Sequence, residues 1–125
     1  MTNEEIEKIL EKMKFQIATI GQAIDFDRHP VESLIISMDW GREELNLAHD
    51  VFEKWDAKIE TGERISSSAF EADFSKSLGL SYQGLKPVVL SFYKNGQWTN
   101  VCEAYVDSFD GKAPIEYREI MNRPR

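Results

Sequence analysis

Apolar residues spaced three and four positions apart recur along most of this sequence, and this spacing restricts the fold more than any other feature. Side chains at those intervals share one face of an α-helix, whereas a half-buried strand alternates at every second residue. The first stripe follows Thr2 and Glu5, a pair that predicts a helix N-terminus because each side chain can accept a backbone N–H. We therefore expect a long amphipathic N-terminal helix. Its apolar face consists of Ile6, Ile9, Leu10, Met13, Ile17, Ile20 and Ile24.

A polar junction at residues 24–30, Ile-Asp-Phe-Asp-Arg-His-Pro, ends that helix. Asp25 and Asp27 are typical of caps and turns, because short carboxylates accept backbone N–H groups. Pro30 suits the first turn of a helix, where no N–H is needed. The sequence predicts that Asp27 and Pro30 start a short, largely buried second helix. Its apolar face carries Val31, Leu34, Ile35 and Met38.

Glycine and serine mark the ends of the next two helices. Gly41, with Glu44 three residues later, predicts the start of a long third helix, and Gly62 suits its left-handed end. Ser66 and Ser68 can each cap a fourth helix, and the sequence leaves that choice open. The apolar positions of these two helices are Leu45, Ala48, Val51, Phe52, Trp55 and Ile59, then Phe70, Phe74 and Leu78, with Gly79 ending the run.

The segment 87–106 carries conflicting signals. Its β-branched and aromatic residues around Asn95-Gly96 are typical of a β-hairpin. Neither arm alternates at period two, however, and the steps of three and one indicate helices. We favour two helices joined at Gly96, the second with an apolar face of Trp98, Val101, Cys102, Tyr105, Val106 and Phe109.

Several of these segments together resemble the small YhaI-like family of helical proteins. The resemblance is carried by Asp-Phe-Asp-Arg-His-Pro at 25–30 with the apolar run 31–38, by Arg42-Glu43-Glu44, and by the aromatic and glycine segment 92–98. It covers roughly residues 6–109. It implies an all-helical, oligomeric protein and favours helices in the late hairpin. It implies no activity, so it gives no catalytic residue. Pro87, near the start of the fifth helix, departs from the family pattern, as do the Ser66–Ser68 run and the tail.

The expected architecture is therefore all-α, with about six helices: a long N-terminal helix plus a helical bundle or array, assembled as an oligomer. Residues 1–109 form one helical domain, and residues 110–125 form a C-terminal tail that can hold a short helix. Cys102 is the only cysteine, so no internal disulfide can form. With an acidic N-terminus unlike a secretory signal, this indicates a cytoplasmic protein without a membrane span.

Residues with chemical potential are few, and each has a structural interpretation that we prefer. His49 and Glu53 share a helix face but lack the further ligands of a metal site. Asp25 and Asp27 do not fit a calcium loop, because Pro30 and Ile36 occupy the positions that need glycine and glutamate. Cys102 lies on an apolar face, where a thiol packs as a small hydrophobe. We expect no catalytic residue, no cofactor and no metal.

The formal net charge of −7 disfavours binding to nucleic acid or anionic lipid. The leading hypothesis is a non-enzymatic protein that self-associates or binds another protein. The expected surface is the N-terminal stripe Ile6, Ile9, Leu10, Met13, Ile17 and Ile20, although the stripe can also pack on its own domain. A second hypothesis is an acidic inhibitor or regulator of another protein or a nucleic-acid enzyme, binding through Glu43, Glu44 and Glu53. A third is a small-ligand-binding bundle with a pocket near His49 and Cys102.

Overall fold

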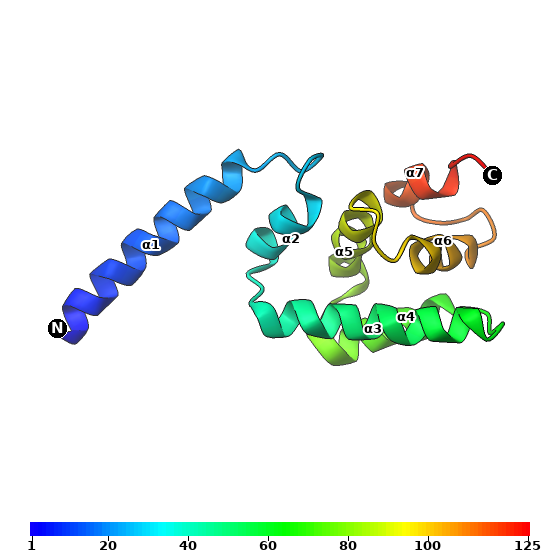
Figure 1. Cartoon of the computed structure of the whole chain (residues 1–125), viewed down its shortest axis with the longest axis horizontal. Coiled ribbons are helices and arrows are strands. Elements are labelled where there is room, and N and C mark those ends of the chain that lie inside the picture. Colours follow the sequence, from blue (N-terminus) through cyan, green and yellow to red (C-terminus); the bar gives the residue numbers. More distant parts are fainter.

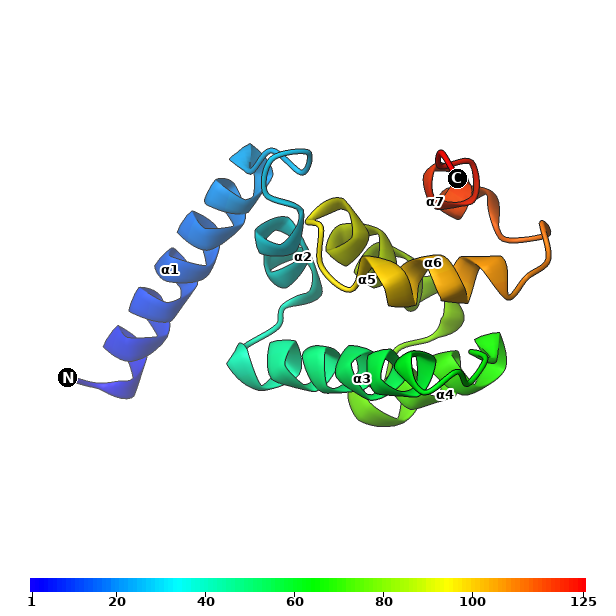
Figure 2. The ribbon, with the colours of Figure 1, turned by 45° about the vertical axis from the view of Figure 1, so that its right-hand side comes forward.

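The protein is entirely helical, which confirms the expected fold class. The computed structural model describes residues 1–125 and contains seven α-helices and one short 3-10 helix, η1, against about six helices expected. One helix, α1, stands apart as an arm, and the others form a rounded body (Figures 1 and 2). The elements are α1 (Asn3–Ala23), α2 (Pro30–Met38), α3 (Arg42–Glu60), α4 (Ser67–Leu78), α5 (Tyr82–Lys94), α6 (Thr99–Asp107), η1 (Ile115–Tyr117) and α7 (Arg118–Met121).

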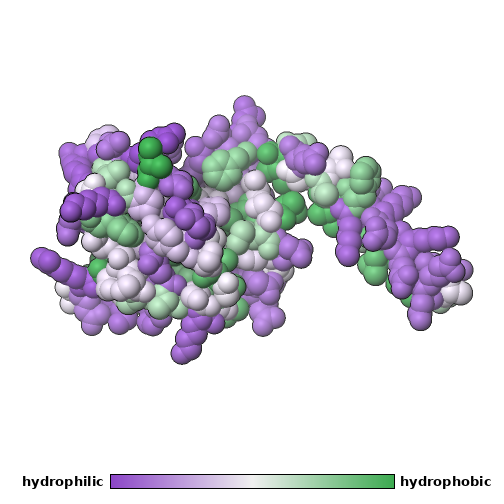
Figure 3. All heavy atoms as spheres, turned by 180° about the vertical axis from the view of Figure 1, so that it is seen from behind, coloured by the Kyte–Doolittle hydropathy of each residue, from purple (hydrophilic) through white to green (hydrophobic).

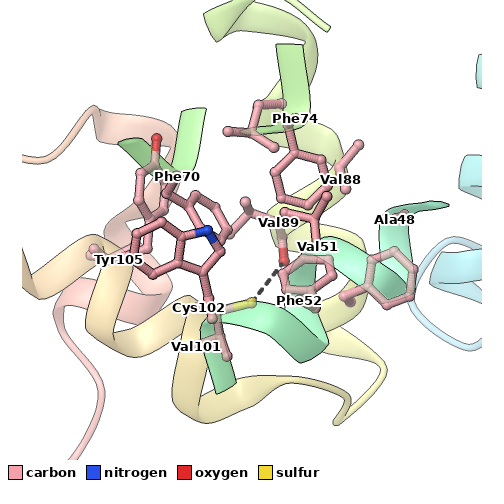
Figure 4. Packing of buried hydrophobic residues seen from close by; sticks show 14 of the residues in the cluster. Ala48, Val51, Phe52, Phe70, Phe74, Val88, Val89, Val101, Cys102 and Tyr105 are labelled. Carbon is pink, nitrogen blue, oxygen red and sulfur yellow. Dashed lines mark hydrogen bonds between the residues drawn. The ribbon is translucent and has the colours of Figure 1, made fainter. Parts of the chain in front are cut away.

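Aromatic side chains from α3, α4, α5 and α6 fill the centre of the body. Figure 4 shows Phe52 of α3 facing Phe74 of α4 in a cluster that also contains Phe70. The ring centroid of Phe52 lies 5.1 Å from that of Phe92 and 5.2 Å from that of Phe74. The indole of Trp98 stacks on the same ring at 6.0 Å. Offset and edge-on aromatic contacts of this kind stabilise a core beyond the area that they bury.

The ends of α3 and α4 confirm the capping predictions. The backbone N–H of Gly41 donates to Glu44 Oε1 at 2.6 Å, and Gly62 has a left-handed φ of 87°. The structure also decides between the two serines, because Ser66 Oγ accepts from the N–H of Ala69 and α4 begins directly after it. Its neighbour Ile65 is buried in the core. With Ser66 as the N-cap, the buried side chains of Ile65, before the cap, and Phe70, in the first turns of the helix, flank the start of α4.

The late hairpin is helical, as the spacing predicted. The two helices α5 and α6 are joined through Gly96, whose φ is 72°. Pro87 lies inside α5, which begins early enough, at Tyr82, to include it. The missing N–H of Pro87 leaves only the carbonyl of Gln83, one turn earlier, without its helical donor. The proline therefore falls in the second turn and does not end the helix.

The C-terminal residues form the expected short helix and pack as part of the body. Tyr117 and Ile120 are both fully buried in the main core. Lys86 of α5 is also buried and its Nζ lies 3.0 Å from Glu116 Oε2. Arg123 Nη2 lies 2.7 Å from Asp107 Oδ2 at the end of α6. These contacts attach the tail to α5 and to α6.

The Asp107 attachment makes stability depend on pH. Hydrogen bonds from Arg123 lower the pKa of Asp107 below its ordinary value of 3.8, against an opposing effect of burial. A carboxyl with a lowered folded pKa stabilises the protein at pH values above its unfolded pKa, about 4, and loses that contribution as the pH falls through the folded pKa. We therefore expect Asp107→Asn to lose less thermal stability than the wild type between about pH 5 and pH 2. Thermal melts across that range measure the difference. Asp50→Asn, at an exposed aspartate of α3 without an ion pair, is the control and should keep the wild-type dependence.

Candidate protein-interaction surface

The apolar stripe of α1 is exposed along its whole length. No residue of α1 is buried, although α1 is the longest helix of the protein. The exposed fractions of the stripe residues lie between 41% at Ile6 and 62% at Ile20. Figure 3 shows the arm projecting from the body, with apolar side chains mainly on the part nearer the body and hydrophilic ones toward its end. Monomeric soluble proteins seldom expose a continuous apolar surface of this extent, so the stripe is the principal candidate for an interaction site. It comprises Ile6, Ile9, Leu10, Met13, Ile17 and Ile20, the residues that the sequence predicts.

The polar junction sets the direction of the arm. Asp25 Oδ1 accepts the backbone N–H of Asp27 at 2.9 Å, and the carbonyl of Asp25 accepts the N–H of His29 at 2.8 Å. These bonds form a compact turn. His29 then occupies the N-cap of α2 without a side-chain bond, and Pro30 follows in the first turn. The prediction that Asp27 starts this helix is therefore wrong, because Asp25 uses its carboxylate within the turn and the helix begins three residues after Asp27.

Asp27 instead joins the junction to the body. Its Oδ1 lies 3.0 Å from Lys94 Nζ at the end of α5, and this hydrogen bond raises the pKa of Lys94. The same ammonium lies 5.8 Å from the ring centroid of Phe26. Because these contacts are largely exposed to solvent, they orient the turn and contribute little to stability.

The arm touches α2 at one edge of the stripe, next to Ile17, and leaves the rest of the stripe free. A Cβ atom added at Gly21 would lie only 2.5 Å from Ile36 Cγ2, so this close approach requires glycine. Successive residues are about 100° apart around a helix, so Ile20 points well away from that contact. An open groove of about 530 Å³ follows the line of contact. Its walls include Lys14 and Ile17 of α1 and Asp39 after α2.

The second helix is less buried than the sequence predicts. Only Pro30 and Leu34 of α2 are buried, where α2 packs on α5. Ile36 remains 37% exposed beside the groove and extends the apolar surface beyond the arm. The expectation of a largely buried helix is wrong because α2 buries only these two residues, and the arm leaves Ile36 partly exposed. Sequence reasoning missed Ile36 because it lies outside the Val31, Leu34 and Met38 face.

The three acidic residues proposed as a second surface lie on α3 in different environments. Glu43 and Glu53 are exposed. Glu44 is half-buried, and its carboxylate accepts the N–H of Gly41, so it caps the helix. Ten residues separate Glu43 from Glu53, about 15 Å along the helix axis. Of the three residues, Glu44 therefore has a structural role as the cap of α3, and Glu43 and Glu53 are exposed at separate positions along the helix.

The region near His49 and Cys102 is packed with protein side chains. His49 Nδ1 accepts the Trp98 Nε1–H at 3.0 Å, and its ring lies edge-on to Phe92 at 5.2 Å. This contact helps to hold Trp98 at its left-handed φ of 54°, an unusual backbone conformation for a bulky residue. Cys102 is fully buried, and burial raises the pKa of its thiol. Both side chains therefore have identified packing roles, and a raised pKa disfavours the reactive thiolate.

Other polar side chains in the body also have structural partners. Tyr105 O–H donates to Glu71 Oε2 at 2.5 Å, and burial raises the pKa of this tyrosine. Asp73 accepts hydrogen bonds from Lys54 and from the Trp55 indole, which ties α4 to α3. No group of three or more His, Cys, Asp or Glu side chains converges in a way that would hold a metal ion. Asp25 and Asp27 serve the turn and the Lys94 ion pair.

Comparison with family models, curated proteins and solved structures finds no match to this chain, so the resemblance to YhaI-like proteins stays a prediction. None of the helices combines the length and the apolar character needed to cross a membrane.

Proposed function

We propose that this protein acts by binding protein, including further copies of itself, through the apolar stripe of α1. The observation that carries the proposal is the exposure of six large apolar side chains on one face of a helix that buries none of its residues. Covering such a face would remove apolar surface from water, which is the main favourable contribution to most protein association.

The arrangement of the arm supports the same proposal. The junction and the Gly21 contact set the direction of α1, which projects from the body (Figure 1), and the side chains of the stripe are exposed to solvent. Ile36 and the groove beside it extend the apolar surface toward α2. The arrangement fits the recognition mode in which an amphipathic helix lays its apolar face against a partner.

Light scattering behind a sizing column tests self-association. We expect the wild type to elute at a multiple of the chain mass at micromolar concentration, and Ile9→Asp with Met13→Asp to elute as a monomer. A charge placed in a buried apolar interface is strongly unfavourable, so the loss should be complete at concentrations where the wild type assembles.

Phe15 provides a matched control on the same helix. It is 73% exposed and lies almost opposite Met13 around the helix. Phe15→Asp introduces the same charge and removes a large apolar group, and it should leave the mass unchanged. A wild type that remains monomeric, or an assembly that withstands both stripe substitutions, would contradict self-association through α1.

A further inference from the structure

We infer that the stripe is covered by α1 of a second copy running antiparallel to it, with Glu7 of each chain beside Lys14 of the other. The inference rests on the proposed self-association and adds its partner, direction and register. It is drawn from the distribution of charge along an arm whose apolar face is unpartnered in the single chain.

The stripe contains the repeat of a helix pair. Ile6, Leu10, Met13, Ile17 and Ile20 step by four, three, four and three residues, which are the a and d positions of successive heptads. In that repeat the flanking e and g positions set the direction and the register of pairing. Glu7 and Lys14 occupy e positions, and Ile9 and Gln16 occupy g positions.

Charge is unevenly distributed along the arm. Residues 3–11 contain four glutamates and one lysine, whereas residues 12–23 contain two lysines and no acid. A parallel pair would place the acidic halves side by side. An antiparallel pair places each acidic half beside the basic half of the other copy. Opposite charges in register favour association, and like charges disfavour it.

One antiparallel register satisfies both the apolar and the charged positions. Ile6 faces Ile17 of the second copy, and Leu10 faces Met13, so these four apolar positions are covered symmetrically, while Ile20 faces Asn3 at each end of the pair. The e positions then bring Glu7 beside Lys14 twice, once at each end. A register shifted by one heptad would instead bring the two Lys14 side chains together. In a parallel pair Lys14 would meet Ile9, so neither charge would be paired.

Charge reversal distinguishes these arrangements. We expect Glu7→Lys or Lys14→Glu alone to raise the dimer dissociation constant about tenfold, since each change replaces two attractive pairs with two repulsive ones. The double variant Glu7→Lys/Lys14→Glu should restore the wild-type constant. Within one helix these residues are about 10 Å apart and do not meet, so restoration requires contact between chains. Lys12→Glu, at a position facing away from the stripe, is the matched control and should have little effect.

Disulfide trapping tests the antiparallel direction of the two α1 helices independently of the charge variants. A mixture of Ile6→Cys and Ile17→Cys chains should form the mixed disulfide, and neither variant alone should form one. Cys102 is fully buried, so the wild type should form none.

Each alternative outcome has its own consequence. Disulfides between identical positions, or a double charge variant weaker than both single variants, would overturn the antiparallel arrangement while leaving self-association intact. Wild-type chains that remain monomeric would overturn the proposed self-association itself, and the pairing with it.

Discussion

Replacing Phe52 with alanine should lower the free energy of unfolding by about 3–5 kcal/mol, the usual range for a large aromatic removed from a core. Phe52 is fully buried at the point where α3, α4, α5 and α6 meet, and four aromatic rings surround it. Two of these rings belong to α4, one to α5 and one to the N-cap of α6, and rings held by separate elements cannot all move into the space that the substitution leaves. The cavity and the lost aromatic contacts should therefore both lower the free energy of unfolding.

Chemical denaturation followed by far-UV circular dichroism measures this effect. Phe15→Ala removes the same group from a site that is 73% exposed and should change the free energy of unfolding by about 0.5 kcal/mol or less. A similar loss for both variants would mean that the arm and the body are not the separate environments described above. A loss of less than about 1 kcal/mol at Phe52 would contradict the position of that ring in the core.

Ending the chain after Ala113 should be the second severe change. It removes Tyr117 and Ile120, both fully buried, and the partners of Lys86 and Asp107. Burial of each large side chain stabilises a protein by about 1.5–3 kcal/mol, so the truncation should remove about 4 kcal/mol or more. That is a large part of the stability of an ordinary domain.

Deleting the arm provides the comparison for the truncation. Loss of residues 1–23 removes more chain but no buried residue, so the thermal midpoint of the body should stay within a few degrees of the wild type. The truncation after Ala113 should lower the midpoint by tens of degrees or prevent folding. A stable protein without its last twelve residues would contradict the packing of Tyr117 and Ile120.

Helices could be predicted well because their signals are local. Apolar spacing identified α1, α3 and α4, and it correctly outweighed the Asn95-Gly96 turn signal in the segment that became α5 and α6. Caps at Gly41 and Gly79 followed from the backbone chemistry of single residues. These features need no knowledge of what lies across the fold.

Features that depend on distant partners could not be predicted. The burial of Tyr117 and Ile120 depends on surfaces formed by earlier helices, and nothing in the tail's own spacing indicates it. Asp27 carries the right side chain for a cap, but the turn at Asp25 leaves it before the N-cap of α2, where it pairs with Lys94 of α5. The spacing of Trp98 indicates that it lies on an apolar face. Nothing in the sequence indicates that a hydrogen bond to His49 would hold it in a left-handed conformation.

The stripe on α1 was found for the same local reason, and its exposure was not predictable. Spacing shows that residues share a face, but it does not show whether the rest of the chain returns to cover that face. Here the turn at Asp25 and the contact at Gly21 direct α1 away from the body. The sequence left both outcomes open, and the structure exposes the stripe.

Because α1 is isolated from the body, the stability of this helix depends on whether a partner binds it. Most of the stability of a protein helix comes from packing its apolar face, and this helix has no buried residue within its own chain. If a second copy covers the stripe, that contact supplies the missing packing. Stabilisation of the helix and association of the two chains are then one coupled equilibrium. The arm would then respond to the concentration of the protein, while the body would keep its fold at any dilution. Sequence changes along α1 could alter the choice of partner without disturbing the core.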